Sequence, residues 1–421
     1  MKTNLPDMNE TARANRLHIA LLGITNAGKS SLINALTEQE LALVSPVKGT
    51  TTDPVYKAME LFPLGPVVFI DTAGLDDASE LGELRKKKTF EVLQKTDLAI
   101  LVLDASVGVT AFDREILQHL KGKKILALGV LNKIDLLSAG QSETAKAAPV
   151  IQAKAAAIAK ELDLKIIPVS TETGQGVREL RAFLGQLALP EAEERLLVAD
   201  LLHAGEIGVL VTPIDASAPK GRLILPQQQT LREMLDHQII AVVCQDSYLK
   251  DTLAKLSEQP RLVITDAQVF QKVNADTPAH IPLTAFSILF ARYKGDLKEL
   301  VKGARTVEKL QDGDKVLIAE ACTHHRQDDD IGTVKIPNWL RQKTGKQLIF
   351  EHASGYSFPD NLSEYALIVH CAGCMLNRRA MLYRLHQAQA AGIPIVNYGV
   401  LIAYLHGILE RALEPFPELF Q

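Results

Sequence analysis

Cysteine is scarce in this sequence: only four of the 421 residues are cysteine. So few thiols in a chain of this length do not form the disulfide framework of a small secreted domain. They indicate a reducing compartment, and we therefore expect a cytoplasmic protein. The start of the chain, Met1 to Arg16, is polar and lacks the apolar segment that a secretory signal peptide contains.

An excess of charge of one sign is also absent. The formal net charge is −4 and the pI is about 6.3, so the composition indicates neither a nucleic acid nor an anionic membrane as partner. No apolar run approaches the ~18 residues that a membrane-spanning helix needs. A hydrophobic share of 47% is typical of globular proteins, and the length allows for several domains.

A glycine-rich loop follows the first apolar segment. Residues 17–22 predict a strand, and Gly23 to Ser30 fit the phosphate-loop pattern G-x-x-x-x-G-K-S before a helix expected over 31–36. Main-chain N–H groups of such a loop bind phosphate oxygens, Lys29 reaches the β- and γ-phosphates, and Ser30 binds Mg²⁺. The nucleotide contacts expected here are Gly23, Asn26, Ala27, Gly28, Lys29, Ser30 and Ser31.

A second motif lies after the strand predicted at residues 67–70. It reads Asp71-Thr72-Ala73-Gly74. The Asp71 carboxylate can hold the Mg²⁺ shell, and the Gly74 N–H can sense the γ-phosphate.

Two further motifs indicate that the base is guanine. The strand predicted at 125–131 precedes Asn132-Lys133-Ile134-Asp135, and the Asp135 carboxylate can accept two hydrogen bonds that only a guanine edge offers. Residues 166–169 precede Ser170 and Thr171, on a loop that could close over the base. Every motif follows a strand, as expected for the carboxyl edge of a doubly wound sheet.

From Gly23 to about Leu187 the sequence resembles the small GTPases of the group that includes Era, EngA and TrmE. The resemblance implies a Gly-Thr-Thr switch, which Gly49-Thr50-Thr51 matches, and it places a Mg²⁺-binding threonine on Thr51, with Thr50 and Thr52 as near alternatives. Lys29, Thr51 and Gly74 are then the residues expected to act in GTP hydrolysis.

Three positions bear on the rate of that hydrolysis and on the base loop. Leu75 stands where Ras-like enzymes have a water-orienting glutamine, which implies slow turnover. In TrmE-like GTPases a K⁺ ion supplies the missing positive charge; Asn26 matches the asparagine that helps to hold it, or it only stabilises the loop. Glu172 stands where the family has the lysine of Ser-Ala-Lys, so a lysine contact with the base is not expected.

The middle of the chain alternates strand and helix signals without a phosphate loop. Cys244 ends one of its apolar strands and fits a small buried hydrophobe. A domain without chemistry between two that have it is often a joint or an oligomer interface, and we expect it to form a dimer.

The other three cysteines follow two apolar runs near the end of the chain. Cys322 follows residues 316–319, and Cys371 and Cys374 follow residues 366–369. Both runs predict parallel strands, whose carboxyl ends border the ligand crevice of an open α/β sheet. Three thiolates favour zinc or an iron–sulfur cluster over hard cations, although three buried thiols without chemistry would give the same spacing. Helices are expected over 377–390 and 400–413.

A fourth metal ligand has several contenders, because polar side chains flank the cysteines. Glu320 would share a strand face with Cys322. Histidines at such places are either ligands, hydrogen-bond donors to the ligands or core residues. The contenders are Glu320, His324, His325 and His370.

The pattern Cys322-x-His324 … His370-Cys371-x-x-Cys374, behind a GTPase and a middle domain, resembles the HydF family, the GTPases that mature iron–iron hydrogenases. The resemblance implies a 4Fe–4S cluster on the three cysteines and favours His324 and His370 as further ligands. The expected fold is α/β throughout: a P-loop GTPase domain over 1–188, an α/β middle domain over 189–281 and a doubly wound cluster domain over 282–421.

The same resemblance implies the function. HydF proteins are scaffolds or carriers that receive a diiron precursor from the radical-SAM partners HydE and HydG and deliver it to an apo-hydrogenase. The implied cofactors are GTP/GDP, Mg²⁺, K⁺ and the cluster, and a homodimer is expected. The alternative is a zinc-stabilised regulatory GTPase acting on the ribosome or on tRNA. It would need a basic RNA-binding appendage, such as a Gly-x-x-Gly loop, and we find none in the sequence.

Overall fold

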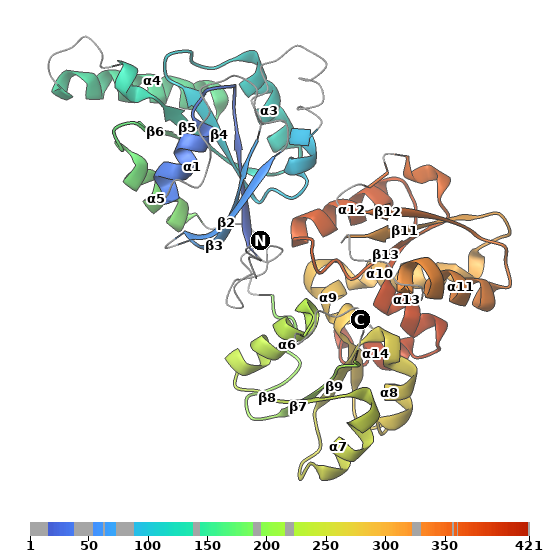
Figure 1. Cartoon of the computed structure of the whole chain (residues 1–421). Helices are drawn as coiled ribbons and strands as arrows, with labels where there is room; N and C mark the ends of the chain where they lie inside the picture. Colours follow the sequence, from blue (N-terminus) through green and yellow to red (C-terminus); the bar gives the residue numbers. More distant parts are fainter. Residues whose placement is uncertain are drawn as a thin grey trace, which may run out of the picture. The chain divides into compact units, whose positions relative to one another are not determined.

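The protein is described by a computed structural model and divides into two compact units, Met1–Glu193 and Glu194–Gln421 (Figure 1). The described residues are 16–37, 54–61, 64–72, 88–137, 144–187, 195–214, 223–321, 330–355, 358–359 and 361–419. Several residues with predicted roles lie outside them: Thr50, Thr51, Thr52, Gly74, Leu75, Cys322, His324 and His325.

The first unit is built on a six-stranded sheet in the order β2-β3-β1-β4-β5-β6. Only the pairing of β2 with β3 is antiparallel. The strands are β1 (Leu17–Leu22), β2 (Val55–Leu61), β3 (Gly65–Asp71), β4 (Leu98–Asp104), β5 (Leu126–Asn132) and β6 (Ile166–Pro168). The described helices are α1 (Lys29–Thr37), α3 (Ala111–Gly122), α4 (Thr144–Leu162) and α5 (Val177–Gln186).

Both faces of this sheet are buried, which explains the continuous apolar runs of its strands. Ala20 and Leu22 of β1 belong to a core shared with α3 and α4. Ile19 and Leu21 belong to a second core, shared with α1 and α5. The parallel strands therefore all present their carboxyl ends at one edge, where the predicted nucleotide motifs begin.

The second unit contains two four-stranded parallel sheets, and the first has the order β10-β9-β7-β8. Its strands are β7 (Ile207–Val211), β8 (Ile240–Cys244), β9 (Leu262–Thr265) and β10 (Leu283–Ala285). The helices in this part are α6 (Leu225–Asp236), α7 (Leu249–Lys255), α8 (Phe270–Asp276) and α9 (Phe286–Lys294). The sheet thus continues past residue 281, the last residue of the expected middle domain.

The second sheet of this unit has the order β12-β11-β13-β14, again parallel throughout. Its strands are β11 (Lys315–Glu320), β12 (Ile349–Ser354), β13 (Leu367–His370) and β14 (Ile395–Asn397). The helices are α10 (Leu297–Arg305), α11 (Ile336–Thr344), α12 (Arg378–Ala390), α13 (Tyr398–Leu405) and α14 (Leu409–Leu413). The predicted doubly wound α/β fold is confirmed.

Helix ends follow the local sequence. Asn377 caps α12 as expected, with its side chain accepting from the Ala380 N–H over 3.1 Å. The helix expected over 400–413 is instead two helices, because Gly407 adopts a left-handed φ of +70° between α13 and α14.

One hydrophobic core joins the two sheets of the second unit, running in sequence from Leu197 to Phe416. Phe286 and Phe290 of α9 are buried in it, and full burial of such a side chain contributes about 1.5–3 kcal/mol. The domain boundaries at 188/189 and 281/282 stay predictions. Among the described helices, none has the length and apolarity needed to cross a membrane.

Candidate functional site

The loop between β1 and α1 requires glycine at two positions. Gly23 and Gly28 have φ of +147° and +93°, values that other residues rarely adopt. A Cβ on Gly23 would lie 2.3 Å from the Val102 oxygen, and one on Gly28 would lie 2.2 Å from the Asn132 side-chain nitrogen. The loop therefore curls tightly between β4 and the Asn132 side chain.

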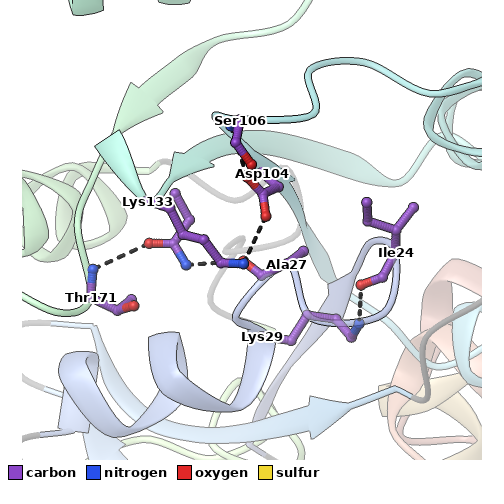
Figure 2. Close-up of polar contacts among 8 residues, drawn as sticks. Ile24, Ala27, Lys29, Asp104, Ser106, Lys133 and Thr171 are labelled. Atoms are coloured by element: carbon purple, nitrogen blue, oxygen red, sulfur yellow. Dashed lines mark hydrogen bonds and ion pairs between the residues drawn. The ribbon is translucent and has the colours of Figure 1, made fainter. Parts of the chain in front are cut away.

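The Lys29 side chain lies across this loop. Its ammonium group donates to the carbonyl oxygens of Gly23 at 3.0 Å and of Ile24 at 2.9 Å. Figure 2 shows the side chain turned back toward Ile24. Only 7% of the residue is exposed, so a positive charge is held beside the start of α1, where the helix dipole also favours an anion.

Two of the three predicted Mg²⁺ ligands touch each other. The Ser30 hydroxyl donates to Asp71 Oδ2 over 2.5 Å. Burial raises the pKa of Asp71 above its usual value, and this hydrogen bond and the Lys29 charge oppose only part of the rise. Hydroxyl and carboxylate oxygens are the ligands that Mg²⁺ takes, and an adjacent pair beside the phosphate loop fits that ion.

Asn132 connects the phosphate loop to the base side of the pocket. Its side-chain nitrogen donates to the Ala27 oxygen over 3.0 Å, and its oxygen accepts from the Thr171 N–H over 3.2 Å. Since Asn132 is fully buried, the end of β5 fixes the phosphate and base loops together.

The neighbouring Lys133 is fixed by Asp104, the last residue of β4. The ammonium group lies 2.7 Å from Asp104 Oδ2, and Ser106 donates to Oδ1 from its N–H and its hydroxyl (Figure 2). Burial raises the pKa of Asp104, but the hydrogen bonds from Lys133 and Ser106 outweigh it and hold the pKa below its usual value. Lys133 has a positive φ of 61°, a conformation that this ion pair helps to hold.

Asp135 is oriented by Ser170 from the following loop. The Ser170 hydroxyl donates to Asp135 Oδ1 over 2.6 Å and accepts from the Thr173 N–H at 3.1 Å. Asp135 is half-buried, so its carboxylate is held in one orientation while part of it stays accessible to a ligand. Of the predicted nucleotide residues, Lys29, Ser30, Asp71, Asn132 and Asp135 thus lie at the same edge of the sheet.

Of the four other predicted positions, two lie within the described residues. Asn26 is exposed and has a left-handed φ of 62° at the turn of the loop, and Ser31 is half-buried in the first turn of α1. Thr51 and Gly74 lie outside the described residues, so their roles stay predictions.

The cysteine loop begins where β11 and β13 lie side by side. These strands are neighbours, with Ala319 opposite His370, although β12 lies between them in sequence. The chain order reverses here, which makes this the crevice where open α/β sheets bind ligands. The Cys371 N–H donates to the Ala319 oxygen at 3.0 Å, and the Ala321 N–H donates to Cys371 Sγ at 3.1 Å.

Cys374 lies half-buried three residues further on, after a turn at Gly373 with φ of +65°. Burial raises the pKa of the Cys374 thiol, and the charge of Lys294 opposes the rise. An N–H donor to sulfur, two neighbouring thiols and a buried cation form a donor set that fits a thiolate-bound metal centre.

His370 has both ring nitrogens engaged. The guanidinium of Arg384 donates to Nε2 over 2.7 Å, and Nδ1 lies 2.6 Å from the Cys371 oxygen. Burial and the Arg384 charge lower the pKa of His370 to about 3, so the ring is neutral and Nδ1 is the donor. In this arrangement His370 orients the loop and offers no lone pair to a metal.

Glu320, at the end of β11, is buried. Its Oε1 accepts from the Tyr398 hydroxyl over 3.1 Å. Burial raises the pKa of Tyr398 far above its usual value, and the charges of Glu320 and Cys371 add to the effect. Tyr398 therefore fixes one oxygen of the Glu320 carboxylate at the end of β11.

Cys322 and His324, the remaining predicted metal residues, lie outside the described residues. Within the described ranges no three His, Cys, Asp or Glu side chains are grouped to hold a metal ion. Cys244 ends β8 in the other sheet, half-buried, where burial raises its thiol pKa.

Three residues of these sites were missed from the sequence. Asp104 could have been found, because it ends a buried strand just as Asp71 does. Lys294 and Arg384 gave no signal, since their partners in the cysteine loop are distant in sequence.

Three family models match the chain. The model of the 50S ribosome-binding GTPase matches residues 18–133, the hydrogen maturase F dimerization domain matches 197–295, and the hydrogen maturase F tetramerization domain matches 298–415. The last two together span more than half of the chain.

Individual relatives match the GTPase part. The tRNA modification GTPase MnmE of Roseiflexus sp. (strain RS-1) is 38% identical over 190 residues, 44% of this chain and 39% of that protein. The GTPase Der of a Nitratiruptor species is 37% identical over 136 residues, 32% of this chain and 29% of that protein. This chain thus spans less than two fifths of either relative.

Among solved structures, an Era variant from Aquifex aeolicus bound to GDP and AlF4⁻ is similar with a TM-score of 0.36 and 22% identity. The match covers 54% of this chain and 92% of that chain.

Proposed function

Because the chain belongs to the HydF family of hydrogenase-maturation GTPases, we propose that it hydrolyses GTP and carries a 4Fe–4S cluster on Cys322, Cys371 and Cys374. One contact carries the cluster part of the proposal. The Ala321 N–H donates to Cys371 Sγ over 3.1 Å, and Cys322 follows Ala321 directly, about 3.8 Å further along the chain. The residue directly before the third cysteine thus contacts the sulfur of the second.

In the nucleotide pocket, Lys29 neutralises the β- and γ-phosphates, and Ser30, Asp71 and Thr51 hold Mg²⁺. Asp135 selects guanine, Asn132 and Thr171 shape the base side, and the Gly74 N–H senses the γ-phosphate. Asn26 is assigned to K⁺, which supplies positive charge in the transition state of a slow hydrolysis.

In the cysteine loop, three thiolates leave one iron with an exchangeable ligand, which is where a precursor would dock. His370 is the weaker contender for that ligand, because both its ring nitrogens are engaged. Glu320 and His324 are the contenders that we retain. The cargo is the diiron precursor, received from HydE and HydG and delivered to the apo-hydrogenase in the cytoplasm, where thiols stay reduced.

The first sheet of the second unit supplies the dimer contact in this proposal. β8 is an edge strand, and its Ile240 and Val243 are 50% and 43% exposed. An exposed apolar edge favours pairing with a second strand, and the matching family model is described as a dimerization domain. A second copy of the chain that paired along β8 would cover part of these two side chains, which lie on opposite faces of the strand.

Anaerobic reconstitution with iron and sulfide tests the cluster. We expect about four irons per chain and a broad charge-transfer absorption, as thiolate-held clusters give. One tightly bound zinc per chain without iron uptake would instead support the zinc-stabilised GTPase acting on the ribosome or tRNA. Nucleotide competition tests the pocket: ATP competing as well as GTP would contradict the assignment of Asp135.

A further inference from the structure

A buried lysine outside the cysteine motif reaches into the cysteine loop. Lys294 is the last residue of α9, and only 2% of it is exposed. Its ammonium group donates to three main-chain oxygens, those of Gly373 at 3.4 Å, Cys374 at 3.0 Å and Leu376 at 2.8 Å. One side chain thus holds most of the turn that carries the second thiol.

The groups around Lys294 indicate that its positive charge has a negative partner other than a carboxylate. Its ammonium group lies 5.3 Å from the centre of the Phe290 ring, and within the described part of the chain no carboxylate forms an ion pair with it. A buried cation is costly unless it is paired. The ammonium group contacts the carbonyl oxygen of Cys374 at 3.0 Å, so a thiolate on that residue would supply the missing negative charge.

We propose that Lys294 is a positioning residue for the metal centre, which clamps the Cys-x-x-Cys loop and offsets the negative charge of the thiolates. This inference rests on the cluster assigned above. Its clamp comes from α9, which lies within the residues that match the dimerization domain, whereas the loop lies within the tetramerization match. Lys294 therefore ties the cysteine loop to the neighbouring sheet.

A second side chain, the neutral ring of His370, also holds the cysteine loop, so the effect of losing Lys294 can be told apart from it. His370 donates to the Cys371 oxygen and is itself fixed by Arg384. Loss of Lys294 should therefore loosen the Gly373–Leu376 side of the turn while Cys371 stays in place. The expected defect is weakened retention of iron together with a changed potential, rather than failure of the whole sheet.

Two substitutions separate the hydrogen bonds that Lys294 donates to the loop from the effect of its positive charge. Lys294→Met keeps the apolar stem and loses both functions, whereas Lys294→Gln keeps N–H donors without the charge. Lys298→Met is the matched control, because Lys298 is exposed on the next helix. Each protein is reconstituted anaerobically, and we measure iron per chain, the rate of iron loss to a chelator and the midpoint potential by an EPR-monitored titration.

Loss of a residue that supports metal ligands typically costs about 10–100-fold in metal affinity, so Lys294→Met should lose iron faster by a factor in that range. Its potential should become more negative, because reduction adds negative charge that the lysine no longer offsets. Lys294→Gln should recover part of the retention but keep the lowered potential. Lys298→Met should match the wild type.

Two outcomes would overturn the inference. One is an equal rate of iron loss and an equal midpoint potential in the wild type and both variants. The other is a Lys294→Gln protein that loses iron more slowly than Lys294→Met but keeps the midpoint potential of the wild type. Melting of the apo-proteins, followed by circular dichroism, identifies a variant that fails to fold, and the polar variant Lys294→Gln then decides. A wild type that takes up no iron at all would instead contradict the proposed function.

Discussion

Two buried lysines, one in each unit, do similar work on two different loops. Lys29 donates to two carbonyl oxygens of the phosphate loop, and Lys294 donates to three of the cysteine loop. They are 7% and 2% exposed. In each case an ammonium group holds a tight turn that follows a parallel strand. The same group carries a positive charge that would favour an anionic ligand.

The difference lies in where each lysine comes from. Lys29 holds residues five and six positions before it, within its own motif. Lys294 holds residues 79, 80 and 82 positions after it, from a helix of the neighbouring sheet. The lysine of the phosphate loop is therefore supplied by the motif itself, whereas the lysine of the cysteine loop depends on how two sheets pack.

The largest effect is expected at the thiols. Cys371→Ala and Cys374→Ala should each abolish cluster assembly, because a 4Fe–4S centre left with two thiolates lacks the ligands it needs. Cys244→Ala, in the other sheet, should take up iron as the wild type does. Iron and sulfide analysis after anaerobic reconstitution measures this. Full iron uptake by Cys374→Ala would contradict the assignment of the cysteine loop as the cluster site.

Next is the loss of Lys29. Lys29→Ala removes a charge that stabilises the transition state, and we expect GTP hydrolysis to fall by about 10²–10³-fold. The cluster should be unaffected, because Lys29 and the cysteine loop belong to separate compact units. Phosphate release and iron content, measured on the same preparation, test both statements. A parallel loss of iron would mean that the two loops are not independent.

A smaller effect is expected at the base. Asp135→Asn should weaken GTP binding by about 2–3 kcal/mol, because a charge-assisted pair is lost in a dry pocket. The variant should also accept xanthine nucleotides, whose O2 can accept a hydrogen bond from the new amide. Binding titrations with both nucleotides measure the change. Unchanged GTP affinity would remove Asp135 from the site.

The smallest effect concerns the ion. GTP hydrolysis should be faster in K⁺ than in Na⁺ at equal ionic strength, and Asn26→Ala should flatten the response, since Leu75 cannot orient water and the transition state needs another stabiliser. Steady-state rates in the two salts decide. Equal rates for the wild type would remove K⁺ from the mechanism.

The sequence was most informative where structure is local. β1 lies at the predicted residues 17–22, and Asn377 caps α12 as expected, because apolar runs and cap residues act on their immediate neighbours. The nucleotide motifs were placed at one sheet edge for a similar reason. Each motif directly follows its strand, and parallel strands share their carboxyl edge.

Long-range partners are where the sequence says least. The sequence left His370 either as a fourth ligand or as a hydrogen-bond donor beside the ligands, and it gave no sign that Arg384 on α12 would contact its Nε2. Nothing in the apolar sequence of α9 indicated that Lys294 would be buried against the cysteine loop. Such contacts depend on how helices pack over a sheet, and neither periodicity nor spacing reports that packing.

The most direct test of the account is the activation of an apo-hydrogenase that already holds its own 4Fe–4S cluster. The protein is reconstituted, loaded with a diiron precursor and mixed with the apo-hydrogenase, and hydrogen evolution is measured. We expect activity with the wild type and with Cys244→Ala, and none with Cys371→Ala, which offers the precursor no cluster on which to dock. Equal activation by Cys371→Ala, or none by wild type with a full cluster, would overturn the proposed function.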